Sequence, residues 1–226
     1  MGSDDLFKKR REDRKKRTHD FRVPKANSYL IVTEGKKTEP LYFSGIKDKI
    51  LASVGGTVDI VDLPLIDIYG EGASTEKLIE ITEEYVSKAK IIYQNIWVIF
   101  DKDDFADFDS AVALGKSKGY SVGWSNQCFE YWIFLHFEYS DSDLHRSQWF
   151  EKLNSLFKAN HLTEHGYEKN LENLYDLLDS IDGISTAIKN AKRRMADYRE
   201  GIDKPSDMSP GTTVHLLVEQ LRDYIS

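Results

Sequence analysis

The sequence predicts an α/β fold in which a small, mostly parallel four-stranded sheet is wrapped by helices and followed by a helical half. Two near-continuous apolar runs, at 28–33 and 95–101, are typical of strands buried on both faces of a parallel sheet. Segments of helical periodicity separate these runs from other strand-like segments, which gives a β-α-β-α-β-α-β order. From Cys128 onward the pattern becomes helical.

Each element of the sheet half has a local signal. Strands are expected at 28–33, 57–70, 95–101 and 120–125. The second of these contains Pro64, which lacks an amide hydrogen and therefore favours an edge position. Helices are expected at 38–53, 74–89 and 107–118. Thr38 begins the first helix, and Ser74 or Thr75 caps the second.

The second half is expected to pack on this core. The segment "CFEYWIFLHF" (128–137) is too apolar to be exposed and predicts a core helix. Further helical patterns follow at about 148–160, 168–180, 184–199 and 212–225. We therefore divide the chain into an N-terminal arm (1–25), an α/β core (26–126) and a helical region (127–226).

Composition excludes several classes of protein. The chain has 226 residues and is 40% hydrophobic, which is enough to form a real core. No apolar run approaches the roughly 18 residues that a membrane span needs, so no membrane partner is expected. The single cysteine, Cys128, excludes an internal disulfide framework. We expect a cytoplasmic protein.

The charge is distributed unevenly. The net charge is −7, yet residues 1–25 hold ten Lys/Arg against five Asp/Glu. The run "KKRREDRKKR" (8–17) is too polar to pack and predicts a flexible arm. Such an arm is suited to contact nucleic acid phosphates, and equally suited to serve as a solubilising tail.

Carboxylates follow the two most apolar strands. Glu34 comes directly after the first strand, and Asp101 and Asp103 come at the end of the third. In an open α/β sheet functional groups gather beyond the carboxyl ends of the strands, so these three side chains are expected to meet. Carboxylates held together repel one another unless a cation lies between them, and oxygen ligands suit Mg²⁺ or Mn²⁺. The sequence therefore predicts a metal site and a catalytic centre here.

Two further acidic residues have alternative interpretations. Glu130 is a charged residue inside an apolar segment, where an unpaired charge would be costly. It either completes the catalytic centre as part of a second metal position or forms a structural ion pair. Glu39 lies in the first turn of a helix, where it interacts well with the helix N-terminus, and its closeness to Glu34 makes it a supporting residue of the site.

Two groups of basic residues could bind the phosphate groups of a substrate. Lys36 and Lys37 follow Glu34 in the same loop. Lys192, Arg193 and Arg194 are clustered in the later helical segment. Substrate phosphates are one interpretation of these residues, and a solvated helix face that balances nearby acids is the alternative for the second group.

These motifs carry a family resemblance. A strand followed by Glu-Gly, and two βα units later a strand followed by Asp-x-Asp, resembles the Rossmann-like Toprim fold of topoisomerases, primases and OLD-type nucleases. The resemblance to the RloB-like family, Toprim-related proteins of bacterial phage-defence loci, extends over most of residues 28–225. It is carried by "VTEGKKTEPLYF", "VIFDKDDF", "SNQCFEYWIFLHF" and "PGTTVHLLVEQL".

The resemblance implies a function. Glu34, Asp101 and Asp103 would form the metal-binding core of a Toprim-type, Mg²⁺-dependent endonuclease. It would cleave RNA such as tRNA, or DNA, in abortive anti-phage defence, often beside an ATPase partner. The alternative is a non-catalytic subunit that binds metal or a nucleotide and regulates a partner ATPase.

Overall fold

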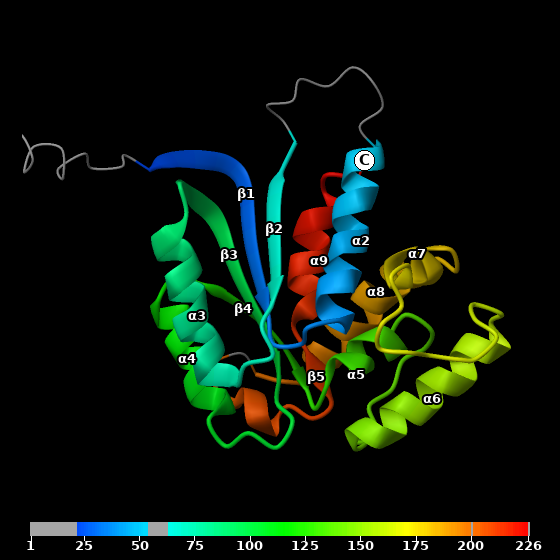
Figure 1. The fold of residues 1–226 in the computed structure, drawn as a ribbon. Coiled ribbons are helices and arrows are strands. Elements are labelled where there is room, and N and C mark those ends of the chain that lie inside the picture. Colours follow the sequence, from blue (N-terminus) through cyan, green and yellow to red (C-terminus); the bar gives the residue numbers. More distant parts are fainter. Residues whose placement is uncertain (1–21, 54–62, 200, 226) are drawn as a thin grey trace, which may run out of the picture.

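The computed structural model describes residues 22–53, 63–199 and 201–225. Within them the strands form one five-stranded sheet in the order β2-β1-β3-β4-β5 (Figure 1). The strands are β1 (Val23–Thr33), β2 (Leu65–Gly70), β3 (Ile91–Asp101), β4 (Ser121–Asn126) and β5 (Gly211–Thr212). The first four are parallel, and β5 pairs antiparallel with β4. The predicted α/β class with a mostly parallel sheet is confirmed.

Helices cover both faces of the sheet (Figure 1). One face carries α3 and α4, and the other carries α2 and most of the helical half, including α9. Met195 and Met208 of the helical half pack on the α3–α4 side. The helices are α2 (Thr38–Ser53), α3 (Thr75–Lys88), α4 (Phe108–Ser117), α5 (Phe129–Phe134), α6 (Arg146–Ala159), α7 (Leu174–Asp179), α8 (Gly183–Met195) and α9 (Val214–Arg222), with a 3-10 turn η1 (Pro205–Asp207). The helices of the sheet half match their predicted ranges closely.

Strands β1 and β3 lie in the middle of the sheet, as their unbroken apolar runs predict. Along β1 successive side chains point to opposite faces. Tyr29 and Ile31 therefore join the core beneath α2 and α5, whereas Leu30 and Val32 pack with α3 and α4. Because both faces are covered, both sets of side chains are apolar.

Two features of the sheet differ from the sequence prediction. The sheet has five strands rather than four, because the two residues of β5 pair with Ser125 and Asn126. A strand this short has no periodicity of its own, so its pairing depends entirely on tertiary contacts. The second strand begins at Leu65, immediately after Pro64, and forms the sheet edge as predicted. Of the range predicted for it, 57–62 lies outside the described residues.

The helical half shares its hydrophobic core with one face of the sheet. Every residue of α5 is buried, as the apolar segment predicts. Trp132 of α5 and Trp149 of α6 belong to the same buried cluster as Tyr42 of α2 and Trp97 of β3. The predicted helices at 168–180 and 184–199 are shorter in the structure, where they form α7 and α8.

The described chain begins close to the predicted arm. Strand β1 starts at Val23, and residues 23–25 pair with Ile91–Tyr93 of β3, so these residues of the predicted arm belong to the sheet. Residues 1–21 lie outside the described part of the chain. None of the helices in the described ranges is both long enough and apolar enough to cross a membrane.

Candidate metal centre

Glu34 and Asp101 meet at the carboxyl edge of the sheet because β1 and β3 are parallel neighbours. The Glu34 backbone amide donates to the Ile99 carbonyl at 2.8 Å, which extends the ladder by one residue. The Glu34 carboxylate then accepts a hydrogen bond of 3.1 Å from the Asp101 amide. The predicted juxtaposition of these two residues is therefore present.

Gly35 allows a third carboxylate to approach. Glu39, in the first turn of α2, is buried. A Cβ atom added to Gly35 would lie only 2.1 Å from Glu39 Oε2, so no side chain fits at this position. The glycine after β1 thus permits close contact between the β1–α2 loop and a buried carboxylate, a typical reason for glycine beside a functional group.

Helix α5 brings a fourth carboxylate. The backbone amide of Phe129, at the start of α5, donates to Asp101 Oδ2 at 3.0 Å. The next residue, Glu130, is buried in the same region and contributes to the electrostatics of Asp101. We refer to Glu34, Glu39, Asp101 and Glu130 as the carboxylate cluster.

Glu130 also has the ion pair that its alternative interpretation requires. Lys169 Nζ lies 2.9 Å from Glu130 Oε1, and the Tyr167 hydroxyl donates to the same oxygen at 3.4 Å. The Glu130 side chain is 5% exposed, whereas that of Lys169 is 63% exposed. One cation therefore reaches into the cluster from the solvent side, which offsets part of the cost of burying Glu130.

Burial and mutual repulsion favour the protonated forms of Glu34, Glu39 and Asp101. Burial, followed by the charges of Asp103, Glu39 and Asp107, raises the pKa of Glu34 to about 7 from its ordinary value of 4.5, although the hydrogen bond from the Asp101 amide opposes the shift. Burial, with Glu130 as the next contributor, also raises the pKa of Glu39 to about 7. The pKa of Asp101 is raised well above its usual range by burial, then by Glu39, Glu130 and Glu34. A bound cation would relieve this repulsion.

The chemistry of the cluster fits a hard divalent cation. All four side chains are carboxylates, and Mg²⁺ prefers oxygen ligands. Glu34 and Asp101 would hold Mg²⁺ or Mn²⁺, with Glu39 and Glu130 beside them. Among the residues that the structure describes, no three potential ligand side chains already form a metal-binding group. The metal role of Glu34, Asp101 and Asp103 stays a prediction.

Asp103 is held by a partner that sequence reasoning missed. Its carboxylate lies 2.9 Å from Arg146 Nη1, at the start of α6, and the same guanidinium lies 3.6 Å from Asp104. The Asp103 amide donates to the Gln127 carbonyl at 3.0 Å. These contacts orient Asp103 toward α6, although it remains near enough to raise the pKa of Glu34.

Comparison with known proteins identifies the family. The model of the family described as RloB-like protein matches residues 29–221, which is most of the chain. This protein belongs to the RloB-like family. Searches of curated proteins and of solved structures find no match. The Toprim-like character of the sheet therefore stays a prediction from sequence.

The RloB-like chain carries two exposed lysines next to the cluster. Lys36 and Lys37 follow Glu34 and Gly35 in the β1–α2 loop, and both are exposed. The Lys36 side chain extends across the β2–α3 loop, where a Cβ atom at Gly72 would lie 2.4 Å from Lys36 Cε. Their role as phosphate ligands stays a prediction.

The three basic residues in the last turn of α8 have intramolecular partners. Lys192 forms an ion pair with Glu219, and the Arg193 guanidinium stacks 3.8 Å from the centre of the Tyr139 ring. The Arg194 side chain is only 12% exposed and forms an ion pair with Asp197 at 2.9 Å. Their predicted phosphate-binding role stays a prediction, and these contacts give each a structural role as well.

Lys169, Tyr167 and Arg146 are the residues of this region that sequence reasoning did not find. Lys169 and Tyr167 lie in "GYEKN" (166–170), an irregular segment between α6 and α7 without any motif. Arg146 is the first residue of α6 and has no distinctive neighbours in sequence. Since each contacts an acid far away along the chain, only tertiary structure reveals their roles.

Proposed function

We propose that this RloB-like protein is a metal-dependent nuclease that hydrolyses phosphodiester bonds of RNA such as tRNA, or of DNA. The observation that carries the proposal is the carboxylate cluster at the edge of a parallel sheet, beside two exposed lysines. Family membership supports a role in anti-phage defence, where the protein would act in the cytoplasm beside an ATPase partner.

We assign a role in the proposed reaction to each residue of the site from its position. Mg²⁺ or Mn²⁺, when bound, would supply positive charge that stabilises the developing charge on the scissile phosphate. Glu34 and Asp101 would hold it, and Asp103 would contribute after leaving Arg146. Lys36 and Lys37 would bind neighbouring backbone phosphates as point charges.

Lys169 supports the reaction through Glu130. Their ion pair of 2.9 Å fixes the Glu130 carboxylate at the rear of the cluster, and the exposed side of the ammonium remains free to contact a phosphate. In hydrolysis a water oxygen adds to phosphorus as the water gives up a proton, the bond to the leaving oxygen breaks, and the leaving oxygen takes up a proton. A positive charge near the leaving oxygen favours this step.

A second function has its own supporting observation. The Glu130–Lys169 and Asp103–Arg146 ion pairs neutralise two of the five acids of this region within the chain itself. Such pairing is also expected of a non-catalytic protein that binds a metal or nucleotide and regulates a partner ATPase. Under this alternative nucleic acid is bound without being cut.

Cleavage assays distinguish the two functions. The full chain is incubated with tRNA, single-stranded RNA and DNA in Mg²⁺, in Mn²⁺ and in EDTA. We expect cleavage that disappears on chelation, and losses of orders of magnitude in Glu34→Gln and Asp101→Asn. Asp104→Asn is the matched control, because its side chain is 82% exposed on the same loop.

Melting temperatures of the same variants test the site without activity. Asp101→Asn replaces a buried carboxyl group whose ionised form is disfavoured, while an oxygen still accepts from the Phe129 amide, so the metal-free variant should melt at or above the wild-type temperature. Addition of Mg²⁺ should stabilise the wild type and Asp104→Asn more than Asp101→Asn. Full cleavage by both site variants would show that the assignment is wrong, and binding without products would favour the regulatory alternative.

A further inference from the structure

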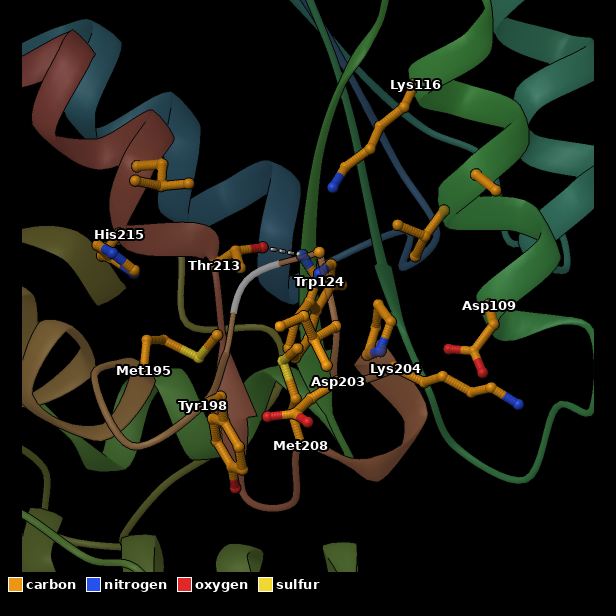
Figure 2. A pocket seen from close by; sticks show the side chains of 16 residues that line it. Asp109, Lys116, Trp124, Met195, Tyr198, Asp203, Lys204, Met208, Thr213 and His215 are labelled. Atoms are coloured by element: carbon orange, nitrogen blue, oxygen red, sulfur yellow. Dashed lines mark hydrogen bonds between the residues drawn. The ribbon is translucent and has the colours of Figure 1, made fainter.

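A cavity of about 450 Å³ lies apart from the carboxylate cluster (Figure 2). It is bordered by α4, by the start of α9 and by residues of the ranges 195–199 and 201–208. Its volume falls within the range of small-molecule sites in proteins. No member of the carboxylate cluster lines it, so a ligand here would not compete with a metal at that cluster.

The interior of the cavity is apolar and aromatic. Trp124 of β4 and Met208 are buried in its wall, and Met195 and Tyr198 complete that side (Figure 2). Aromatic rings and thioethers make favourable contacts with flat ring systems. This lining therefore suits an aromatic body better than a strongly hydrated one.

The aromatic wall is held in place before any ligand arrives. The Arg194 guanidinium lies 4.5 Å from the centre of the Tyr198 ring, and the Tyr198 hydroxyl donates to the Pro210 carbonyl at 3.2 Å. The Trp124 amide donates to Thr213 Oγ1 at 3.0 Å, which joins β4 to the start of α9 (Figure 2). A preformed wall lowers the entropic cost of binding.

Apolar side chains at the rim are left in water. Ile202 is 69% exposed and Leu216 is 44% exposed, and both line the cavity. Single exposed apolar residues are ordinary, but these two line the same cavity, so both present apolar surface to a ligand bound there. A ligand with an apolar body would remove that surface from water, which is favourable in proportion to the area covered.

Two lysines that line the cavity have no ion pair within the described chain. Lys116 and Lys204 line it, and neither forms an ion pair with another residue in the described ranges. Lys116 extends from α4 toward the side of α9 (Figure 2). An ammonium group in this position favours a ligand with negative charge.

The acids of the cavity are already engaged. Asp109 accepts hydrogen bonds from the amide of Ser206 at 2.9 Å and from its hydroxyl at 2.6 Å. Asp203 forms an ion pair of 2.6 Å with Arg199. These carboxylates therefore have partners of their own, and the lysines remain available to an outside anion.

We propose that this cavity binds a small organic anion with a flat aromatic body. A nucleoside monophosphate and an aromatic carboxylate share this chemistry. The ring would contact Tyr198 and the two methionines, and the anionic group would contact Lys116. The inference concerns a second site and holds whether or not the carboxylate cluster cleaves nucleic acid.

Calorimetric titration of the full chain tests the proposal. The probes are AMP, GMP, CMP and UMP, indole-3-acetate as an aromatic carboxylate, and decanoate as a flexible apolar anion. EDTA is present throughout, so that a metal at the carboxylate cluster does not contribute. We expect saturable binding at one site per chain for at least one aromatic anion. If nucleoside monophosphates bind more tightly than indole-3-acetate, the natural ligand belongs to the nucleotide class, and the reverse order indicates an aromatic carboxylate.

Variants locate the binding. Lys116→Gln should weaken the affinity by about tenfold, the typical effect of losing one charge-assisted contact. Lys118→Gln is the matched control, since Lys118 lies two residues further along and pairs with Glu83 at 2.6 Å. Ala113→Leu, at an exposed α4 position that lines the cavity, should narrow it and weaken binding while the melting temperature stays near that of the wild type.

Three results would overturn the proposal. One is the absence of binding by every aromatic anion. Another is binding that persists unchanged in Ala113→Leu or in Lys116→Gln. The third is tighter binding of decanoate than of any aromatic probe, because the cavity would then prefer a flexible apolar anion to a flat aromatic one.

Discussion

Gly35 shows how a single residue shapes the candidate metal centre. It follows Glu34 directly, and its missing side chain leaves the space that the Glu39 carboxylate occupies. The sequence shows the Glu-Gly pair but not the reason for the glycine, because Glu39 approaches from the first turn of α2. This close approach of a loop to a buried carboxylate exists only in the folded protein, so the sequence does not reveal it.

Gly35→Ala should destabilise the protein by about 1–3 kcal/mol, the usual cost of overpacking. The added Cβ would lie 2.1 Å from Glu39 Oε2, so the carboxylate must move. Urea denaturation of the wild type, Gly35→Ala, Glu39→Ala and the double variant measures this. The cost of the alanine should shrink markedly when Glu39 is also replaced, since the clashing atoms are gone. Equal costs in both backgrounds would contradict the explanation.

At the scale of elements, a buried polar contact joins α2 to the end of α5. The Tyr42 hydroxyl lies 3.0 Å from His136 Nε2, and His136 Nδ1 lies 3.0 Å from the Trp132 carbonyl. Since Nδ1 faces carbonyl oxygens, it carries the proton and donates, and Nε2 accepts from Tyr42. Burial lowers the pKa of His136 to about 3 from its ordinary value of 6.5.

This pKa shift predicts an acid-sensitive contribution to stability. The folded protein holds His136 neutral, while the unfolded chain takes up a proton below pH 6.5, so the contribution is complete above that pH and is lost as the pH falls toward about 3. Between pH 7.5 and pH 5 the wild type should lose about 2 kcal/mol more than His136→Gln. Urea denaturation at both pH values measures the difference.

A control separates this effect from the general titration of the protein. His165 is exposed, so His165→Gln should follow the wild-type pH dependence. The raised pKa values of buried carboxyl groups act in both the wild type and the variants and cancel in the comparison. Parallel curves for the wild type and His136→Gln would refute a neutral buried histidine.

At the scale of the whole molecule, the sheet half and the helical half share one core. Tyr42 and Ile99 of the first half pack in the same buried cluster as Trp132, Trp149 and Leu217 of the second. Strand β5, from the end of the chain, also completes the sheet beside β4. The sheet half and the helical half predicted from the sequence are therefore packed around one hydrophobic core and do not form separate cores.

A shared core predicts that the chain unfolds as one unit. Calorimetry of the full chain should show a single transition, with equal calorimetric and van't Hoff enthalpies. A fragment of residues 1–126 should lack cooperative unfolding, because it exposes the apolar face that α5 and α9 cover. Two resolved transitions, or a fragment with a sharp transition of its own, would show two independent domains.

The sequence by itself determined the α/β class, the order of the elements in the sheet half and the meeting of Glu34 with Asp101. These follow from local signals, since apolar periodicity identifies strands and helices and parallel strands bring their carboxyl ends to one edge. Only the tertiary structure decided which residues contact that edge of the sheet. Arg146 forms an ion pair with Asp103, Lys169 forms one with Glu130, and β5 pairs with β4. Each joins residues distant in the chain, and their contacts depend on how whole elements pack.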